Sequence, residues 1–250
     1  YDVGEFEGAA YIVMEMVDGG SLVDWLEAYG PMPPKRAVDV TIEICKAISY
    51  AHDKGVIHRD IKPHNVLIHR DGSCRVTDFG IARMADENMS MTKTGAVMGT
   101  WGYMAPEQRT NAKGVDERGD VYAIGATLYT LATNCMPVDL FAADRDEELL
   151  DGVSEYLVVP IRRATQYKRE DRYSSVAEFE KILWEIRSQL PDDPEDTPPL
   201  LKCVSKPPSP PDADAIANAI SLPTHWALER AGRPDVKGQT LLPVDVLPGH

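Results

Sequence analysis

Cysteine is scarce in this sequence, with only four residues among 250, and no two of them form a Cys-x-x-Cys pair. Such wide spacing argues against a zinc site and against a network of disulfides. We therefore expect reduced, buried thiols at all four positions, which are Cys45, Cys74, Cys135 and Cys203.

Positive charge is also in deficit. Lysine and arginine number 26 against 40 aspartate and glutamate residues, so the formal net charge is −14 and the pI is near 4.8. A balance of this sign argues against a general nucleic-acid binder or a protein that binds anionic membranes. No signal peptide and no apolar run of 18 or more residues are present, so we expect no membrane contact within this chain. The 43% of hydrophobic residues suffice for a core.

The first half of the chain shows short alternating elements. Residues 1–17 resemble a β-hairpin turning at Glu7-Gly8. Ser21 is a candidate cap for a short helix that ends near Gly30, and Pro33-Pro34 suits the start of a longer helix that runs to Lys54 and stops at Gly55. A second small hairpin is expected from 66–68 and 74–76, which flank an Asp71-Gly72 turn.

The second half is more helical. A helix over 116–133 is apolar on nearly every side, which is typical of a helix at the centre of a domain. Another is expected over 175–190, with Ser175 and Glu178 forming a capping box. Eight prolines in 191–211 indicate an extended linker. Residues 212–250 suggest two short helices, near 212–220 and 224–231, with no assignable function.

The chemistry is concentrated in two motifs that flank the second hairpin. The first is His58-Arg59-Asp60-Ile61-Lys62-Pro63-His64-Asn65, and the second, twelve residues later, is Asp78-Phe79-Gly80. Folding the hairpin would bring Asn65 and Asp78 together as oxygen ligands for Mg²⁺. Asp60 would then be free to accept a hydrogen bond from a substrate hydroxyl, while Lys62 approaches a transferring phosphate.

Together these motifs resemble those of eukaryotic-type (Hanks-type) protein kinases, and Lys62, two residues after the aspartate, marks the serine/threonine branch of that family. The resemblance implies an α+β fold, mainly the helical C-terminal lobe of a kinase (18–190) with a strand remnant and hinge (1–17). It implies transfer of the γ-phosphate of ATP, with Mg²⁺ or alternatively Mn²⁺, to Ser or Thr hydroxyls of protein substrates. Asp60, Lys62 and Asn65 would be catalytic, and Asn65 and Asp78 would hold the metal. The sequence resembles bacterial members more than animal ones.

The same resemblance implies roles for further residues. Met14, Glu15, Val17 and Leu67 would contact the nucleotide. Thr100, after Gly99, would lie in the substrate loop. The structural residues would be His58, Arg59, Phe79, Gly80, Glu107, Asp120 and Arg172: His58 would pack near Phe79, Asp120 would brace the catalytic loop, and Arg172 would pair with the Glu107 of Ala105-Pro106-Glu107.

Regulation is expected through the activation segment, which runs from Asp78-Phe79-Gly80 to Ala105-Pro106-Glu107. Thr92 and Thr94 are candidate autophosphorylation sites, and a phosphate there would add about −1.5 to −2 charge that could pair with Arg59. Self-association for phosphorylation in trans is compatible with this scheme. A cytoplasmic setting is expected, since ATP and Mg²⁺ are found there.

Two departures from the family pattern keep alternatives open. The chain opens at Tyr1, in a strand-like pattern, without the glycine-rich loop or strand lysine, so we expect a piece of a longer protein and weak activity from this chain alone. The stretch Cys135–Phe141 replaces the usual Gly-x-x-Pro-Phe signature, which puts substrate docking in question. The alternatives are an N-truncated pseudokinase acting as a scaffold, a small-molecule phosphotransferase, and a metal site at His58, His64 and His69.

Overall fold

The computed structural model describes residues 2–6, 9–79, 101–110, 115–200 and 239–242. The chain divides into two compact units, one made of residues 1–18 and 204–250 and the other of residues 19–203. The first boundary lies next to the one expected after residue 17, whereas the second unit continues past residue 190. Within the described residues, no helix is long and apolar enough to cross a membrane.

The first unit contains a three-stranded sheet in the order β1-β2-β5. β1 (Asp2–Phe6) and β2 (Ala9–Glu15) pair antiparallel, which confirms the expected hairpin. The short strand β5 (Gln239–Leu242) pairs antiparallel with β2, with Ile12 opposite Leu242. We did not predict this strand, and the two helices expected near 212–220 and 224–231 lie outside the described residues.

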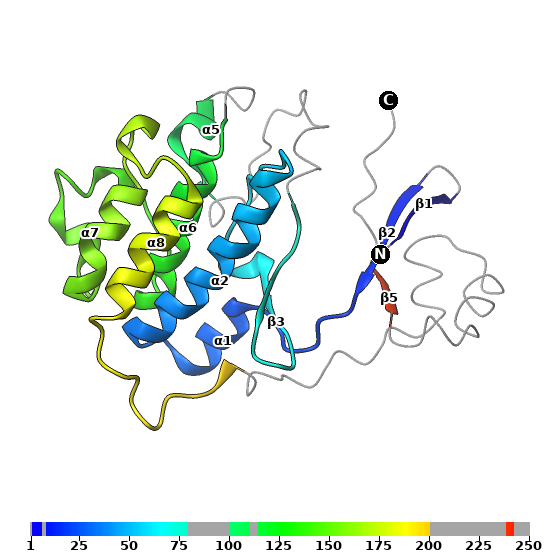
Figure 1. Ribbon diagram of the computed structural model, residues 1–250, viewed down its shortest axis with the longest axis horizontal. Helices are drawn as coiled ribbons and strands as arrows, with labels where there is room; N and C mark the ends of the chain where they lie inside the picture. Colours follow the sequence, from blue (N-terminus) through cyan, green and yellow to red (C-terminus); the bar gives the residue numbers. More distant parts are fainter. Residues whose placement is uncertain (1, 7–8, 80–100, 111–114, 201–238, 243–250) are drawn as a thin grey trace. The chain divides into compact units, whose positions relative to one another are not determined.

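The second unit begins with two helices whose ends follow local rules (Figure 1). α1 (Leu22–Tyr29) opens at a capping box, in which the Ser21 side chain accepts from the Asp24 N–H and the Asp24 carboxylate accepts from the Ser21 N–H at 2.6 Å. α2 (Pro34–Asp53) starts with proline in its first turn. Gly30 and Gly55 follow the two helices with φ of 81° and 74°, values that glycine adopts without strain.

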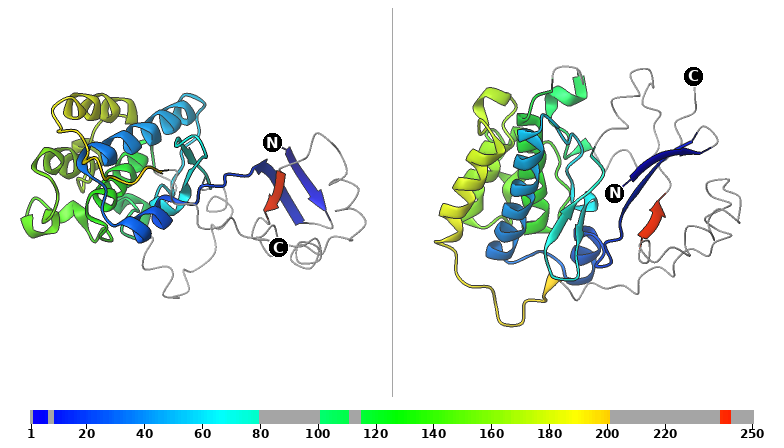
Figure 2. Two further views of the ribbon diagram at one scale, coloured as in Figure 1. Left: turned by 90° about the horizontal axis from the view of Figure 1, so that it is seen from below. Right: turned by 45° about the vertical axis from the view of Figure 1, so that its right-hand side comes forward.

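A small hairpin lies against α2 (Figure 2). β3 (Val66–Ile68) and β4 (Cys74–Val76) pair antiparallel as expected, with Leu67 opposite Arg75. The 3-10 turn η1 (Pro63–Asn65) leads directly into β3. The hairpin therefore joins the two motifs on which the sequence analysis depends.

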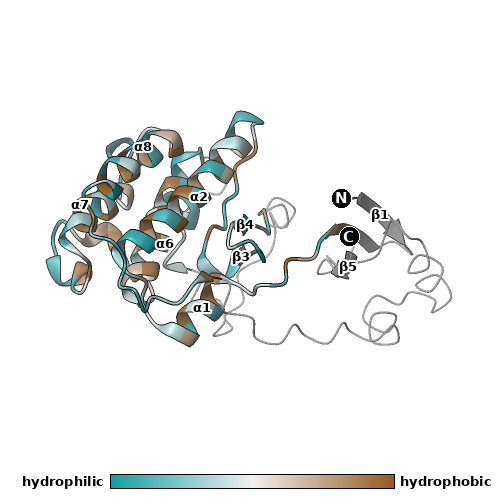
Figure 3. Ribbon diagram, turned by 60° about the horizontal axis from the view of Figure 1, so that its bottom comes forward, coloured by the Kyte–Doolittle hydropathy of each residue, from teal (hydrophilic) through white to brown (hydrophobic). Residues whose placement is uncertain are grey.

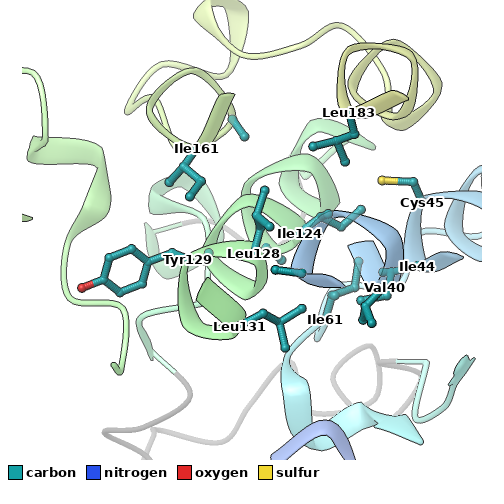
Figure 4. Packing of buried hydrophobic residues seen from close by; sticks show 14 of the residues in the cluster. Val40, Ile44, Cys45, Ile61, Ile124, Leu128, Tyr129, Leu131, Ile161 and Leu183 are labelled. Atoms are coloured by element: carbon teal, nitrogen blue, oxygen red, sulfur yellow. The ribbon is translucent and has the colours of Figure 1, made fainter. Parts of the chain in front are cut away.

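The central helix α6 (Arg118–Thr133) organises the core, as its all-round apolar pattern predicted. It contacts α2 on one side and α7 (Glu155–Ala164) and α8 (Val176–Arg187) on others. Figure 4 shows Ile124 and Leu128 of α6 between Ile44 of α2, Ile161 of α7 and Leu183 of α8. Each of these five side chains is fully buried, and burying one of this size contributes about 1.5–3 kcal/mol.

The remaining elements are short. α5 (Pro106–Thr110) precedes α6, and three 3-10 turns connect the later helices: η3 (Leu140–Ala142), η4 (Glu147–Leu150) and η5 (Arg169–Asp171). Brown and teal segments alternate along α2 in Figure 3, as expected for a helix with one buried and one exposed side.

The start of α8 differs in one detail from the expected capping box. The Ser175 hydroxyl accepts from the Glu178 N–H at 3.1 Å, as predicted. The Glu178 carboxylate, however, accepts from the backbone and hydroxyl of Ser174 rather than from Ser175. The reciprocal half of the box is therefore shifted by one residue, because a second serine in front of the cap competes for the carboxylate.

Residues 191–200, in the segment expected to be an extended linker, lie against the start of α2. Asp192 forms an ion pair with Lys35 at 2.6 Å, and the Asp193 carboxylate accepts from the backbone N–H of Arg36 at 3.2 Å. Leu200 is buried with the core. The packing of the helical unit thus extends to the first ten residues of the proline-rich stretch.

Candidate active site

One loop, at the open end of the β3–β4 hairpin, carries Asp60, Lys62 and Asn65. The Lys62 ammonium donates to the Asp60 carboxylate at 3.0 Å. The Asn65 amide nitrogen donates to the same carboxylate at 3.0 Å and to the backbone carbonyl of Asp60 at 2.8 Å. Asn65 is buried while Asp60 and Lys62 are partly exposed, so an oriented carboxylate faces outward beside a cation.

The hairpin brings Asp78 to the same end as Asn65. The backbone N–H of Thr77 donates to the Asn65 carbonyl at 2.9 Å, and Asp78 follows Thr77 directly. Asp78 is exposed and has a left-handed backbone with φ of 57°, which aspartate tolerates better than most residues. Because its amide nitrogen is bonded to Asp60, Asn65 keeps its amide oxygen for another partner. The two residues therefore offer oxygen ligands of the kind that Mg²⁺ prefers.

The alternative of a metal site at His58, His64 and His69 does not fit the surroundings of these side chains. Among the described residues, no three His, Cys, Asp or Glu side chains gather as a metal cluster. His58 lies inside the fold, and the His69 ring forms a 2.9 Å pair with the Asp71 carboxylate. A site that uses one carboxylate and one amide oxygen, completed by phosphate oxygens, is of a different kind and matches the donors present.

His58 connects the two motifs. Its Nε2 is 3.0 Å from the carbonyl of Thr77, and its Nδ1 accepts from the backbone N–H of Asp60 at 3.3 Å. Because a carbonyl can only accept, the ring carries its proton on Nε2 and is neutral. Burial lowers the pKa of His58, although the nearby carboxylate of Asp120 acts in the opposite direction. The ring also packs on Phe79 with centroids 4.4 Å apart.

Asp120, at the start of α6, holds the backbone of the loop that carries Asp60. Its carboxylate accepts from the backbone N–H groups of His58 and Arg59, each at 2.8 Å. The ring of His52, near the end of α2, lies 2.8 Å from the same carboxylate. The bracing contacts implied by the resemblance are present. The contribution of His52 was missed, because no local pattern relates residues 68 positions apart.

Glu107 and Arg172 form a two-pronged ion pair. The two Arg172 terminal nitrogens donate to the two Glu107 oxygens at 2.6 and 2.7 Å. The Arg172 side chain is fully buried and also donates to the carbonyls of Gln166, Arg118 and Tyr167. This planar fork joins α5 to the chain before α8 and accounts for every donor group of the guanidinium.

Residues 19–21 pack closely against strand β3. The Ile68 N–H donates to the Gly20 carbonyl at 2.8 Å, and Ser21 bridges to Leu67. A Cβ atom on Gly19 would lie 2.1 Å from the carbonyl oxygen of Ile68, so only glycine fits. Leu67 is half-buried here. The expected hinge residues Met14, Glu15 and Val17 belong to the first unit, and their role stays a prediction.

Five of the predicted residues lie outside the described residues: Gly80, Thr92, Thr94, Thr100 and Cys203. The expectation of buried thiols holds for Cys45 and is wrong for Cys135, which is exposed because it follows the end of α6. Burial raises the pKa of the Cys45 and Cys74 thiols, which keeps them protonated.

Comparisons with known proteins match this arrangement. The model of the protein kinase domain family matches residues 1–196. The serine/threonine-protein kinase PknB of Mycobacterium leprae is 37% identical over 209 residues, 77% of this chain and 33% of that protein. The serine/threonine-protein kinase PrkC of Bacillus subtilis is 42% identical over 139 residues, 56% of this chain and 21% of that protein. The chain thus spans about a third or less of the length of these relatives.

A solved structure points the same way. The crystal structure of Rad53 1-466 in complex with AMP-PNP aligns with a TM-score of 0.56 and 26% sequence identity, over 73% of this chain and 48% of that one. Both the family match, which covers most of the chain, and the arrangement of the two motifs around the β3–β4 hairpin lead to one conclusion: the chain belongs to the protein kinase family and resembles its bacterial serine/threonine members.

Proposed function

We propose that this chain carries the catalytic lobe of a serine/threonine protein kinase that transfers the γ-phosphate of ATP to proteins. The observation that carries the proposal is the cluster of Asp60, Lys62 and Asn65, joined by hydrogen bonds of 3.0 Å, next to the hairpin end that bears Asp78. A binding scaffold has no physical need for this whole set, which supports a catalytic role.

The residue roles follow from the chemistry of phosphoryl transfer. The substrate hydroxyl oxygen bonds to the γ-phosphorus while the bond to the oxygen bridging the β- and γ-phosphates breaks, and ADP leaves. Asp60 accepts the proton of the hydroxyl, and Lys62 offsets the charge on the transferring group. Asn65 and Asp78 would hold Mg²⁺, or alternatively Mn²⁺, and the metal supplies neutralisation of phosphate charge when bound. Thr100 would contact the substrate, and Met14, Glu15, Val17 and Leu67 the nucleotide.

Regulation through the activation segment is the second part of the proposal. Among the described residues, no acceptor contacts the Arg59 Nε, which is buried. A phosphate on Thr92 or Thr94 would supply such an acceptor and could order the loop. Self-association would allow one copy to phosphorylate another. We propose a cytoplasmic setting, because ATP and Mg²⁺ are available there.

The experiment compares the native gene product, including any coding sequence that adjoins Tyr1, with its Asp78→Asn variant. Transfer of labelled γ-phosphate to a protein substrate is measured as Mg²⁺ is varied, followed by phosphoamino-acid analysis. We expect phosphoserine or phosphothreonine from the unchanged protein. The variant should need more Mg²⁺ or lose transfer, since an amide replaces a charged ligand. Nucleotide binding without transfer in the unchanged protein would support a scaffold instead.

A further inference from the structure

Arg59 has a left-handed backbone conformation directly before Asp60, with φ of 67°. A residue with a side chain rarely adopts such a conformation, and it persists only where the surroundings hold it. Both polar groups of the Arg59 backbone are held by side chains from other elements. The N–H donates to Asp120 of α6 at 2.8 Å, and the carbonyl accepts from the Gln108 amide nitrogen of α5 at 3.1 Å.

The orientation of the Gln108 amide is fixed by a second contact. Its side-chain oxygen accepts from the backbone N–H of Ala105 at 3.1 Å. Since a backbone N–H can only donate, the oxygen must face Ala105 and the nitrogen must face Arg59. Gln108 therefore joins the turn that precedes α5 to the backbone of the catalytic loop, and it does so through one rigid amide.

We propose that Gln108 is a positioning residue for phosphoryl transfer, which holds the peptide between Arg59 and Asp60 in its active orientation. The inference rests on the proposed function, because it concerns where the Asp60 carboxylate points. Asp120 restrains only the N–H side of Arg59. Without Gln108 the carbonyl side can rotate, and Asp60 then departs from the geometry in which it meets Lys62 and Asn65. Small displacements of this kind slow the chemical step more than they weaken binding.

Two substitutions of similar shape separate this role from simple packing. Gln108→Met fills the same space and donates nothing. Gln108→Glu keeps the acceptor for Ala105, and it can donate to Arg59 only when its carboxyl is protonated. At pH 8 we expect both variants to have kcat reduced by roughly 10- to 100-fold, the scale of a misplacement near 1 Å. The KM values for ATP and for the protein substrate should change less than twofold.

A pH series supplies a readout that loss of packing would not move. As pH falls from 8 to 5.5, kcat of Gln108→Glu relative to Gln108→Met should rise several-fold, because the protonated carboxyl regains the hydrogen bond. The other titratable groups around this contact, Asp60, His58, Asp120 and Arg59, are common to both variants and cancel in the ratio. A flat ratio, or a kcat of Gln108→Met within twofold of the unchanged protein, would overturn the proposal.

Hydrogen exchange tests the same contact without any activity. The amides of residues 58–65 should exchange faster in Gln108→Met, while those of α6 stay unchanged. Equal exchange in both proteins would overturn the positioning role. If the unchanged protein transfers no phosphate while loop exchange still accelerates, the kinase function fails and the structural contact of Gln108 stands, so the two failures are distinguishable.

Discussion

The buried carboxylate of Asp120 accepts a hydrogen bond of 2.8 Å from the backbone N–H of Arg59. This contact ties the central helix α6 to a loop residue whose φ is 67°. The left-handed backbone of Arg59 is thus held by a hydrogen bond to a helix that is buried along nearly its whole length. The catalytic loop should therefore depend on a residue that touches neither nucleotide nor substrate.

Replacing Asp120 by asparagine tests that dependence. One of the two backbone donors would then face an N–H₂ group, leaving buried donors unpaired. We expect the free energy of unfolding to fall by about 1–3 kcal/mol, the penalty for an unsatisfied buried polar group. Urea denaturation followed by tryptophan fluorescence measures the change. Asp53→Asn on the exposed end of α2 is a matched control, and equal stability of the two variants would contradict the bracing role.

Asp193 stabilises a helix that begins 159 positions earlier in the sequence. α2 has Pro33 at its cap position, and no side chain there accepts from the first turn. The Asp193 carboxylate instead accepts from the backbone N–H of Arg36 at 3.2 Å. Asp193→Ala should therefore cost about 0.5–2 kcal/mol of unfolding free energy, the range for loss of an N-cap.

Asp192→Ala is the comparison for this prediction. Asp192 pairs with Lys35 on the surface and, among the residues that the structure describes, accepts from no backbone N–H of the helix. An exposed pair of this kind contributes little to stability. Thermal unfolding of both variants gives the answer. The capping interpretation fails if the Asp192 variant loses as much stability as the Asp193 variant.

These contacts mark how far the sequence could predict the structure. Elements that depend on local chemistry were predicted, such as the capping box at Ser21 and the stop at Gly55. Asp120 and Arg172 were located by resemblance rather than by pattern. The contacts of Gln108 and Asp193 escaped prediction, because each joins a side chain to a backbone group far along the chain. The pairing of β5 with β2 also escaped prediction, because it joins two strands from opposite ends of the sequence.

His58 should make stability depend on pH. The ring is buried and neutral, and burial lowers its pKa below the ordinary value of 6.5. The unfolded chain then binds more protons than the folded chain between the lowered pKa and 6.5, so the free energy of unfolding falls as pH decreases through that window. The slope from one such group is at most about 1.4 kcal/mol per pH unit.

Urea denaturation at a series of pH values from 7.5 to 5 checks the prediction for the unchanged chain and for His58→Tyr. The aromatic variant can still pack near Phe79 and has no proton to gain in this range. We expect its curve to be flatter than that of the unchanged chain. The carboxylates whose pKa values are lowered, Asp71, Glu178 and Asp192, start from ordinary values of 4.5 or less and do not interfere. Parallel curves for the two proteins would contradict the role of His58.

The most direct test of a catalytic kinase is Asp60→Asn in the native gene product, with phosphate transfer and ADP binding measured on the same samples. Asparagine keeps the shape but cannot accept the hydroxyl proton. We expect kcat to fall by about 10²- to 10⁴-fold, the usual contribution of a general base. The affinity for ADP should stay unchanged. Equal transfer rates in the two proteins would contradict the account, because the carboxylate that Lys62 and Asn65 orient would then not take part in the reaction.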